Sequence, residues 1–536
     1  MIRVRLHGRG GHGVKTAGRI VGSAAFHAGF HGQDAPVYGA ERRGAAVASY
    51  AWLDRGPIRE RGVIARPDLI VIADETLLAD PASGVLAAPL ADETPHSAEP
   101  NSRRGLVDLP HFRQRAKRVI FLFQSGAPSQ VDLFDHKPEL SKRSGQPHPE
   151  QVEVFQLGNK NVLMGTPFQF AKHGECGMEL SELIPHLAGV ADDLCLIRSM
   201  FTENNNHPFA LNMLQTGKTF NGRPAMGSWI GYALGTENQD LPGYIVLRDP
   251  AGYNTSGKMV WSSGWLPAVY QGTEFSSSGS PVLHLNSSRP VSAESQARSR
   301  RFLQGLNAAH LDNHPGETEL EARIQNFELA ARMQLTATQV LDLKSETEAI
   351  RKLYGLDNPA TAGYGTRCLM ARRLVESGVR FVQVFPPLDP SFQPWDNHSN
   401  LKNDLRKICG HVDQPSAALI TDLKQRGLLD DVIVMWTGEF GRLPITEGAD
   451  GRDHNRHAFS TIMAGGGFKA GHIYGATDEF GYKSVENRVS VPDLHATILN
   501  QLGIDHTQLT FTHNGRPERL TDPDVTGARV VKELLV

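Results

Sequence analysis

The sequence predicts a mixed α/β protein in which a large domain with a mostly parallel sheet follows a small α/β module. Buried-strand patterns alternate with helical patterns, and this alternation is typical of a sheet covered by helices. A segment rich in Pro, Ala, Ser and charge, residues 81–116, lacks helical or strand periodicity over most of its length. We therefore expect a module over 1–80, a linker over 81–116 and a large domain over 117–536.

The first 80 residues read as half of an α/β layer. Residues 2–6 have a strand pattern, a glycine-rich turn follows, and residues 14–28 have a helical pattern. Two further strand patterns cover 45–52 and 69–73. This order of elements predicts a partial Rossmann-like module.

The turn reads GRGGHG and contains Gly8, Gly10, Gly11 and Gly13 between the first strand and the helix. Small residues at this place let backbone amides and a helix N-terminus approach a phosphate, so the four glycines are candidate cofactor-binding residues. A tight turn without a ligand explains them about as well. The acidic residue that would hold a ribose about 20 residues later has no convincing candidate.

The large domain begins with a strand pattern over 118–123, and two more follow over 379–385 and 432–436. These runs are continuously apolar, as expected of central strands buried on both faces. Helical patterns over 367–377 and 404–426 precede the second and third strands. Helices and buried strands in alternation predict a mostly parallel sheet with helices on both faces.

Composition excludes several classes of partner. Lys and Arg number 55 and Asp and Glu 58, a difference of −3, so no excess positive charge is available for nucleic acid or an anionic bilayer. The longest apolar runs are far shorter than the roughly 20 residues of a membrane span. No apolar signal core follows the first residues, so we expect a cytoplasmic protein with no nucleic-acid or membrane partner.

Acidic and histidine side chains follow the predicted strands of the large domain. Asp396 and His398 come after the second strand, two residues apart, so an extended chain places both on one face. Glu439 follows the third strand in TGEFGR, and GRDHNRH supplies three more candidates, which are Asp453, His454 and His457. Ligands collect at the carboxyl ends of strands in open α/β sheets. The set therefore predicts a divalent metal site for Zn, Mn, Ca or Mg, although such residues also satisfy loop backbone.

Three segments of the module resemble a known family. GRGGHGVKTAGRI, YGAERRGAAVASY and PIRERGVIARPDLIVIADETLL resemble the gamma-subunit domain of the 2-oxoacid (pyruvate/ketoisovalerate) ferredoxin oxidoreductases. The resemblance implies an oxidoreductase subunit as a partner for this module. It covers only part of that domain, and the chain has no run of cluster-ligating cysteines. The module is therefore interpreted as a truncated or fused remnant, or as a docking module.

The large domain resembles a second family. GLLDDVIVMWTGEFG and VPDLHATILNQLGI resemble segments of the sulfatase and alkaline-phosphatase superfamily. RVIFLFQSGAPSQVDLFDHKPEL, ENNNHPFALNMLQTG, WDNHSNL, GEFGR, GRDHN and YGATDEFGY are similar, in order, to an uncharacterised bacterial family of sulfatase-like proteins, over residues 110–536. Members of that family usually carry a twin-arginine export signal.

This second resemblance implies an alkaline-phosphatase-like three-layer sandwich that uses one or two divalent metals and a nucleophile to cleave phosphate or sulfate esters. The metal ligands that it implies are Asp396, His398, Glu439 and His454, with Asp453 and His457 beside them or as substitutes. His207, in NNNHP, would face the substrate.

The sequence departs from the superfamily pattern at three places. The first strand normally ends in an aspartate, but this chain has Gln124, Ser125 and Gly126, with Asp132 further along. The place of the nucleophile reads Asn-Asn-Asn at 204–206, and the nearest hydroxyl is Thr202. Phe440 stands where a histidine often follows the strand-end acid. The catalytic candidates are therefore His207, Thr202 and Ser125.

Three functions follow from these observations. The first is a metal-dependent hydrolase-like protein acting on sulfate or phosphate esters of small molecules or glycans. The second is a catalytically silent binding protein on the same fold. The third is a component of a 2-oxoacid oxidoreductase, through the N-terminal module.

Overall fold

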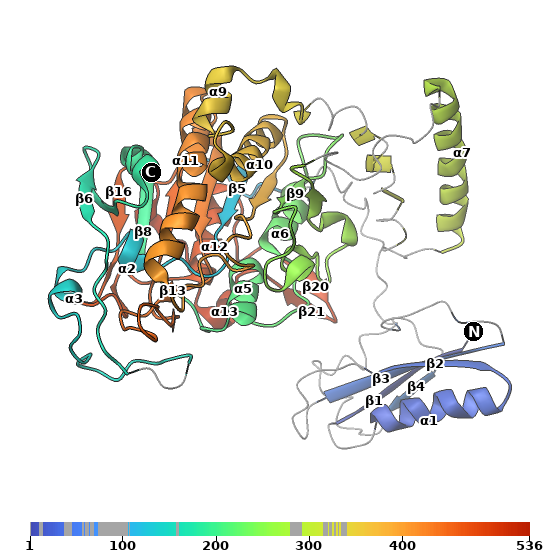
Figure 1. The fold of residues 1–536 in the computed structure, drawn as a ribbon. Coiled ribbons are helices and arrows are strands. Elements are labelled where there is room, and N and C mark those ends of the chain that lie inside the picture. Colours follow the sequence, from blue (N-terminus) through green and yellow to red (C-terminus); the bar gives the residue numbers. More distant parts are fainter. Residues whose placement is uncertain are drawn as a thin grey trace. The chain divides into compact units, whose positions relative to one another are not determined.

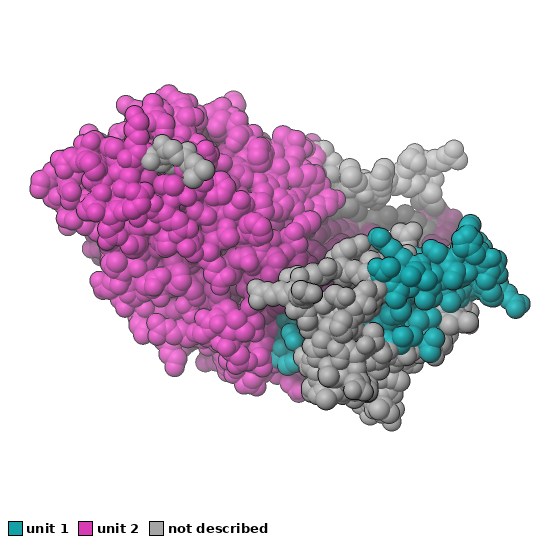
Figure 2. All heavy atoms as spheres, turned by 90° about the horizontal axis from the view of Figure 1, so that it is seen from below, with its two compact units in different colours: residues 1–99, 510–518 teal, residues 100–509, 519–536 magenta. Residues whose placement is uncertain are grey.

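The computed structural model forms two compact units, Met1–Glu99 with Thr510–Glu518, and Pro100–Leu509 with Arg519–Val536, which Figure 2 colours teal and magenta. The predicted linker lies mostly outside the described residues, so the predicted domain boundaries stay a prediction. The structure describes residues 2–9, 14–36, 46–55, 58, 64, 69–72, 105–106, 108–156, 160–278, 292–314, 320, 324–325, 328–330, 332–333 and 340–536.

The first unit contains a mixed four-stranded sheet and a helix. The strands are β1 (Ile2–Arg9), β2 (His31–Pro36), β3 (Ala46–Asp54) and β4 (Leu69–Ile72), in the order β2-β3-β1-β4. Strand β1 runs antiparallel to β3 and parallel to β4. Val4 and Leu6 of β1 pack with Ala17 and Val21 of α1 (Val14–His27), which covers one face. The predicted partial α/β module is therefore present, with one strand, β2, that its sequence HGQDAP does not reveal.

The second unit is built on a nine-stranded sheet, whose path runs β10-β9-β11-β5-β12-β15-β8-β16, with β19 beside β8 (Figure 1). Neighbours along this path run parallel except for β12–β15 and β15–β8. The strands of the sheet are β5 (Arg118–Phe123), β8 (Leu194–Phe201), β9 (Tyr244–Leu247), β10 (Thr273–Phe275), β11 (Phe381–Val384), β12 (Val432–Thr437), β15 (Phe459–Ala464), β16 (His472–Tyr474) and β19 (Val489–Ser490).

Smaller two-stranded pairs and helices complete the described part of the chain. The pairs are β6 (Phe170–His173) with β7 (Met178–Ser181), β13 (Gly441–Arg442) with β14 (His454–Asn455), β17 (Ala476–Thr477) with β18 (Ser484–Glu486), and β20 (Phe511–His513) with β21 (Arg516–Glu518). The α-helices are α2 (Gln130–Leu133), α3 (Pro138–Lys142), α4 (Pro185–Ala188), α5 (His207–Thr216), α6 (Met226–Leu234), α7 (Ala293–Asp312), α9 (Glu348–Leu353), α10 (Pro359–Glu376), α11 (Leu401–Gln425), α12 (Val491–Gln501) and α13 (Pro523–Thr526). Short 3-10 helices are η3 (Ala191–Asp193), η4 (Gly257–Trp261), η5 (Ala268–Tyr270), η6 (Leu343–Ser345), η7 (Leu429–Asp431) and η8 (Lys532–Leu534).

Helices cover both faces of this sheet. Ile120 and Leu122 of β5 belong to one apolar cluster with residues of α10 and α11, which lie against each other in Figure 1. Alternate residues of β5 point to the opposite face, where Phe381 of the neighbouring β11 lies in register with Val119. Phe381 packs so closely on Gly227 of α6 that a Cβ there would lie 2.8 Å from its ring. The predicted three-layer α/β architecture with a mostly parallel central sheet is confirmed.

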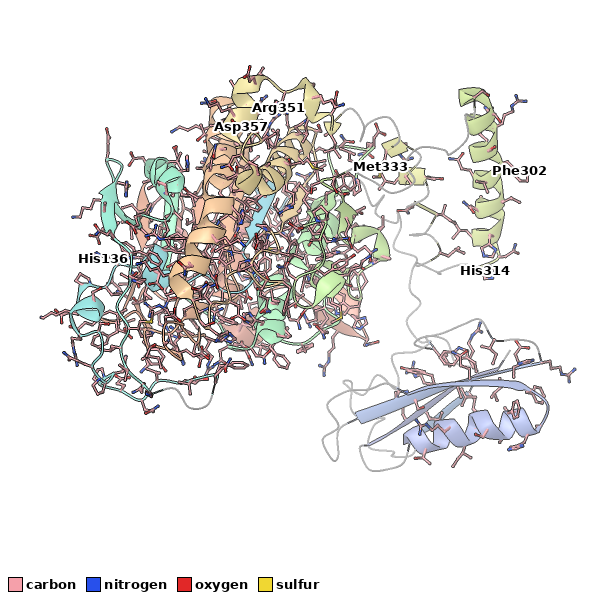
Figure 3. All side chains as sticks on the ribbon, in the orientation of Figure 1. His136, Phe302, His314, Met333, Arg351 and Asp357 are labelled. Atoms are coloured by element: carbon pink, nitrogen blue, oxygen red, sulfur yellow. The ribbon has the colours of Figure 1, made fainter. Side chains whose placement is uncertain are left out.

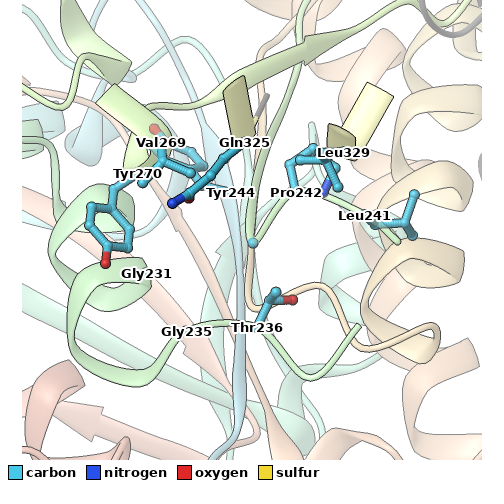
Figure 4. Close-up of a pocket in the computed structure, with 11 residues that line it drawn as sticks. Gly231, Gly235, Thr236, Leu241, Pro242, Tyr244, Val269, Tyr270, Gln325 and Leu329 are labelled. Atoms are coloured by element: carbon cyan, nitrogen blue, oxygen red, sulfur yellow. The ribbon is translucent and has the colours of Figure 1, made fainter. Parts of the chain in front are cut away.

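A small cavity of about 40 Å³ lies beside α6 and is lined by Thr236, Leu241, Tyr244 and Tyr270, among others (Figure 4). This volume is of the size that holds single water molecules. None of the candidate site residues lines it. Among the helices that the structure describes, none is both long and apolar enough to cross a membrane.

His495 predicts an acid-sensitive step in the stability of the second unit. It lies buried in α12, its Nε2 donates to the backbone oxygen of Leu214 at 2.8 Å, and burial lowers its pKa from 6.5 to about 4. Because the folded pKa is depressed, the stabilisation is complete above pH 6.5 and is lost as pH falls through about 4. The loss amounts to about 3 kcal/mol.

His495→Gln keeps a donor near Leu214 and cannot titrate. Urea unfolding followed from pH 7.5 to pH 4 should therefore show a shallower fall in the free energy of unfolding for this variant than for wild type. Equal slopes for the two proteins would contradict the assignment.

Candidate metal centre

The candidate site lies at one edge of the central sheet. Strands β11, β5 and β12 are parallel neighbours, so their carboxyl ends meet at the same edge. The loops that follow them carry Asp396, Ser125 and Glu439, respectively. His207 is the first residue of α5, and His454 begins β14. The fold thus brings together candidates that are hundreds of residues apart.

Three histidines converge on one oxygen atom. Asp396 Oδ1 lies 2.9 Å from His398 Nε2, 3.1 Å from His454 Nε2 and 3.3 Å from His207 Nε2. The Nε2 atoms of His398 and His454 are themselves 3.0 Å apart. The side chain of Asp396 is 21% exposed, while His207 and His454 are buried.

Each of these imidazoles has its other nitrogen against an oxygen. An acceptor at Nδ1 fixes the hydrogen on that nitrogen and leaves a lone pair at Nε2, which is how metal-binding histidines are commonly oriented. The Nδ1 contacts are His207 to Glu439 Oε1 at 2.6 Å, His398 to Glu447 Oε2 at 2.5 Å, and His454 to the backbone oxygen of Asn205 at 2.7 Å.

The charges at the centre leave two acceptors facing each other. Burial lowers the pKa of His454 to about 3, so this imidazole is neutral and its Nε2 carries a lone pair. Burial alone would raise the pKa of Asp396, but the charge of Arg442 and the neighbouring histidines hold it far below its usual range. The carboxylate is therefore ionised. A carboxylate oxygen and an imidazole lone pair at 3.1 Å require a cation or a proton between them.

The donor set fits a divalent cation. One ligand atom from each of His207, Asp396 and His454 lies within 4.8 Å of the others, and a second such group contains His398, Asp453 and His454. His207 Nε2 is buried and makes no hydrogen bond within the described part of the chain, although it faces Asp396. Two imidazoles with one carboxylate would leave coordination positions on a divalent ion open for water or substrate.

Burial would lower the pKa of His207 and of His398, but hydrogen bonds to their carboxylate neighbours outweigh it. The pKa of each imidazole is therefore raised. Burial also raises the pKa of Glu447, the partner of His398. Without a bound cation, these groups can hold the proton that the opposed acceptors need, and binding of a cation would release it.

Arg442 ties the loops of the site together. Its side chain is buried and donates to Asp396 Oδ1 at 2.6 Å and to the backbone oxygens of Trp395 at 3.2 Å and Arg452 at 3.2 Å. It also donates to the backbone oxygens at positions 126 and 127. One guanidinium thus joins the loops after β5 and β11 to the segment that carries His454.

A second buried ion pair supports the same segment. Arg452 donates to Asp132 through Nε at 2.6 Å and through Nη2 at 3.1 Å, and both side chains are fully buried. The backbone N–H of Arg452 donates to the backbone oxygen of Asn397 at 3.0 Å. Asp132 therefore holds the loop beside His454 through Arg452. Within the described part of the chain, it makes no hydrogen bond or ion pair with His207, His398 or His454.

The remaining ligand candidates have other partners. Glu439 is fully buried and accepts hydrogen bonds from His207 and from the backbone N–H of Gly126 at 3.0 Å. Asp453 accepts from the backbone of residues 155 and 156 at 2.8 and 2.9 Å, and from the N–H of His454 at 2.7 Å. His457 faces Glu153 at 2.8 Å. Their roles as metal ligands stay predictions.

The two candidate hydroxyls lie in buried positions. The hydroxyls of Ser125 and Thr202 have no hydrogen-bond partner within the part of the chain that the structure describes. Ser125 directly follows the first residue after β5. Thr202 lines a cavity of about 220 Å³ together with Met213 and Arg488. Neither hydroxyl contacts Asp396 in the described contacts, so a nucleophilic role for either stays a prediction.

The candidate cofactor loop is only partly described. Gly8 lies in β1, paired with Val47 of β3. Gly10, Gly11 and Gly13 lie outside the described residues. Cofactor binding by these glycines stays a prediction.

Sequence reasoning did not find Glu447, Arg442 or Phe155 as parts of the site. Glu447 forms a reciprocal backbone pair with Gly451 that carries it back to His398. Arg442 stands inside the motif GEFGR, but most of its partners are backbone oxygens that no sequence pattern reveals. The ring of Phe155 stacks on His454, about 300 positions away in the chain. No signal in the sequence links such distant residues.

Two family profiles match the chain. The profile described as Protein of unknown function (DUF1501) matches residues 116–535. The chain belongs to the DUF1501 family. A second profile, described as Pyruvate ferredoxin/flavodoxin oxidoreductase, matches residues 3–122 of this DUF1501 chain. Both predicted resemblances, of the N-terminal segment and of the large segment, are therefore confirmed.

Two relatives of known name are similar to a short segment of the DUF1501 chain. Pyruvate synthase subunit PorC of Methanothermobacter thermautotrophicus is 45% identical over 78 residues, which is 15% of this chain and 43% of that protein. The pyruvate/ketoisovalerate oxidoreductases common subunit gamma of Thermococcus kodakarensis is 47% identical over 78 residues, 15% of this chain and 42% of that protein. The chain thus spans less than half the length of these relatives.

A solved structure of a protein in the alkaline phosphatase superfamily from Vibrio parahaemolyticus aligns with 81% of the DUF1501 chain and 77% of its own chain. The identity is 11% and the TM-score is 0.30.

Proposed function

We propose that the large unit is a metal-dependent hydrolase of sulfate or phosphate esters. The observation that supports it best is the convergence of His207, His398 and His454 on Asp396 Oδ1, each with its Nδ1 against an oxygen acceptor. This orientation directs the Nε2 atoms toward a cation. Burying a charged carboxylate among them is energetically unfavourable, and a bound cation would compensate for that cost.

In this proposal His207, His454 and Asp396 hold the cation. A divalent ion held there would neutralise charge on the ester oxygens and lower the pKa of a water molecule. Arg442 keeps Asp396 ionised and fixed. His398 is 24% exposed at its side chain, and its carboxylate neighbours raise its pKa, so its Nε2 can take up a proton and give it to the leaving oxygen. The substrate is a small-molecule or glycan ester.

Metal analysis and ester hydrolysis test the proposal together. Protein purified with metal present should contain at least about one divalent ion per chain, and it should hydrolyse p-nitrophenyl phosphate or p-nitrophenyl sulfate. Chelation should remove the metal and the activity, and re-addition should restore both. His454→Gln should lose the metal, whereas His136→Gln, which changes a histidine outside the cluster, should keep it.

Two results would redirect the proposal. Protein that binds no metal under metal-replete conditions would contradict the metal site. Protein that binds metal and an ester but turns over neither substrate supports the second candidate, a catalytically silent binding protein on the same fold.

A separate function is proposed for the N-terminal unit, because its sequence is 45% identical to a pyruvate synthase subunit over 78 residues. We propose that this unit docks a 2-oxoacid oxidoreductase subunit. Co-expression of the full chain with the other subunits of such an enzyme should give co-purification in a fixed ratio. Elution of the chain alone, under conditions that keep an authentic gamma subunit bound, would contradict docking.

A further inference from the structure

A strap of residues 148–156 lies along the segment that carries His454. Glu153 binds Arg456 with both carboxylate oxygens at 2.8–3.0 Å, and it also faces His457 at 2.8 Å. The backbone N–H groups of Phe155 and Gln156 donate to Asp453 Oδ2. Backbone and side-chain bonds therefore fix this end of the strap against residues 453–457.

The strap places an aromatic ring on the centre. The rings of Phe155 and His454 stack with centroids 4.6 Å apart and planes 21° apart. Phe440 also contacts the ring of His454, at 4.7 Å, but it is fully buried. Phe155 is 41% exposed, so its ring covers His454 and still presents surface to solvent. His454, which also lies against the rings of Phe440 and His207, is only 2% exposed.

We propose that Phe155, beside the centre, is a substrate-contacting residue, and that it selects esters whose alcohol part is a ring with an apolar face. This inference rests on the proposed hydrolase function. Phe155 stacks on His454, and Asp396 and His398 are partly exposed, so the alcohol part of an ester bound at this centre would come within reach of the exposed ring. Aromatic side chains stack on such faces, and the two backbone bonds to Asp453 hold the platform in place before the substrate arrives.

The charges around Phe155 suit an anionic ester. Asp453, which accepts from the backbone of Phe155, is bound by three backbone N–H groups, and the charge of Glu153 is compensated by the bidentate contact with Arg456. The strap therefore carries a carboxylate whose charge is compensated by an arginine. A sulfate or phosphate group beside Phe155 is repelled less by it than by an unpaired carboxylate.

The preference for esters with a ring is tested by dividing kcat/KM of Phe155→Leu by that of wild type for each ester. The reactivity of the leaving group cancels in this ratio, because both proteins act on the same ester. The esters are p-nitrophenyl phosphate, glucose 6-phosphate and methyl phosphate, or the matching sulfates. We expect losses of about five- to tenfold, mainly in KM, for esters with a ring, and less than about twofold for the methyl ester. The first two esters separate an aryl ring from a sugar ring.

Two controls separate selection from support of His454. Phe155→Leu should retain the metal content and melting temperature of wild type. Phe220→Leu, which changes an exposed phenylalanine beyond the other end of α5 from His207, should leave all ratios near one. Equal losses for all three esters, or loss of metal in Phe155→Leu, would overturn the proposal.

Failure of the hydrolase proposal gives a different pattern, namely no turnover of any ester by wild type. Calorimetry of p-nitrophenyl phosphate and methyl phosphate with metal-loaded protein then decides the role of Phe155. Binding of the aryl ester that weakens in Phe155→Leu supports the platform without catalysis. Absence of binding, or binding that Phe155→Leu leaves unchanged, overturns it.

Discussion

Asp396→Asn is expected to bind metal at least about 100-fold more weakly than wild type and to lose about 3 kcal/mol of unfolding free energy. The amide keeps the shape of the carboxylate but removes the charge on which three Nε2 atoms converge. It also leaves Arg442 buried without a counter-charge, and breaking one partner of a buried pair is strongly destabilising. Metal titration and urea unfolding, each with and without metal, measure the two effects.

Asp430→Asn is the matched control, because it changes an exposed carboxylate on η7 by the same atoms. It should match wild type in both measurements. An Asp396→Asn protein that keeps stoichiometric metal at low micromolar concentration would show that Asp396 is not part of a metal site.

Arg442→Met is expected to be the most destabilising substitution at the site, by about 3–5 kcal/mol, because it leaves Asp396 and several buried backbone oxygens without their donor. Arg442→Lys should fall between this variant and wild type. Lysine keeps the positive charge, but its single ammonium group cannot donate to acceptors on separate loops as the planar guanidinium of arginine does. Urea unfolding of the three proteins measures the order.

Arg351→Met, which changes an exposed arginine of α9 labelled in Figure 3, should shift the unfolding free energy by less than about 0.5 kcal/mol. Metal affinity should fall in the same order as stability, from wild type to Arg442→Lys to Arg442→Met, because Arg442 positions the loop of Asp396. Wild-type stability in Arg442→Met would show that the loops hold their arrangement without this guanidinium.

The central strands could be predicted where burial on both faces makes the sequence continuously apolar. RVIFLF in β5 and VIVMWT in β12 are of this kind, and their predicted bounds agree with the structure to within one residue. β15, with the sequence FSTIMA, and β8, which contains Arg198, carry polar residues that interrupt the pattern. Their place in the sheet depends on antiparallel pairing that local sequence does not encode.

The part of the candidate site that follows parallel strands could be predicted, because ligands collect at the carboxyl ends of such strands. Asp396 follows β11 and Glu439 follows β12, so a shared edge of the sheet brings them near each other. The rule does not say which atoms meet. Glu439 turns to His207 rather than to Asp396, because the backbone N–H of Gly126 and the imidazole take up its oxygens. That choice depends on the packing of α5, which is a tertiary property.

Gly126 carries a consequence for protein engineering. Its φ is +105°, and a Cβ there would lie 2.8 Å from the backbone nitrogen of Asp396 and 2.9 Å from that of Trp395. Position 126 is thus closed to every side chain, including that of alanine. A combinatorial library that restores a carboxylate or a nucleophile after β5 can therefore vary residues 124 and 125, but it must keep codon 126 fixed.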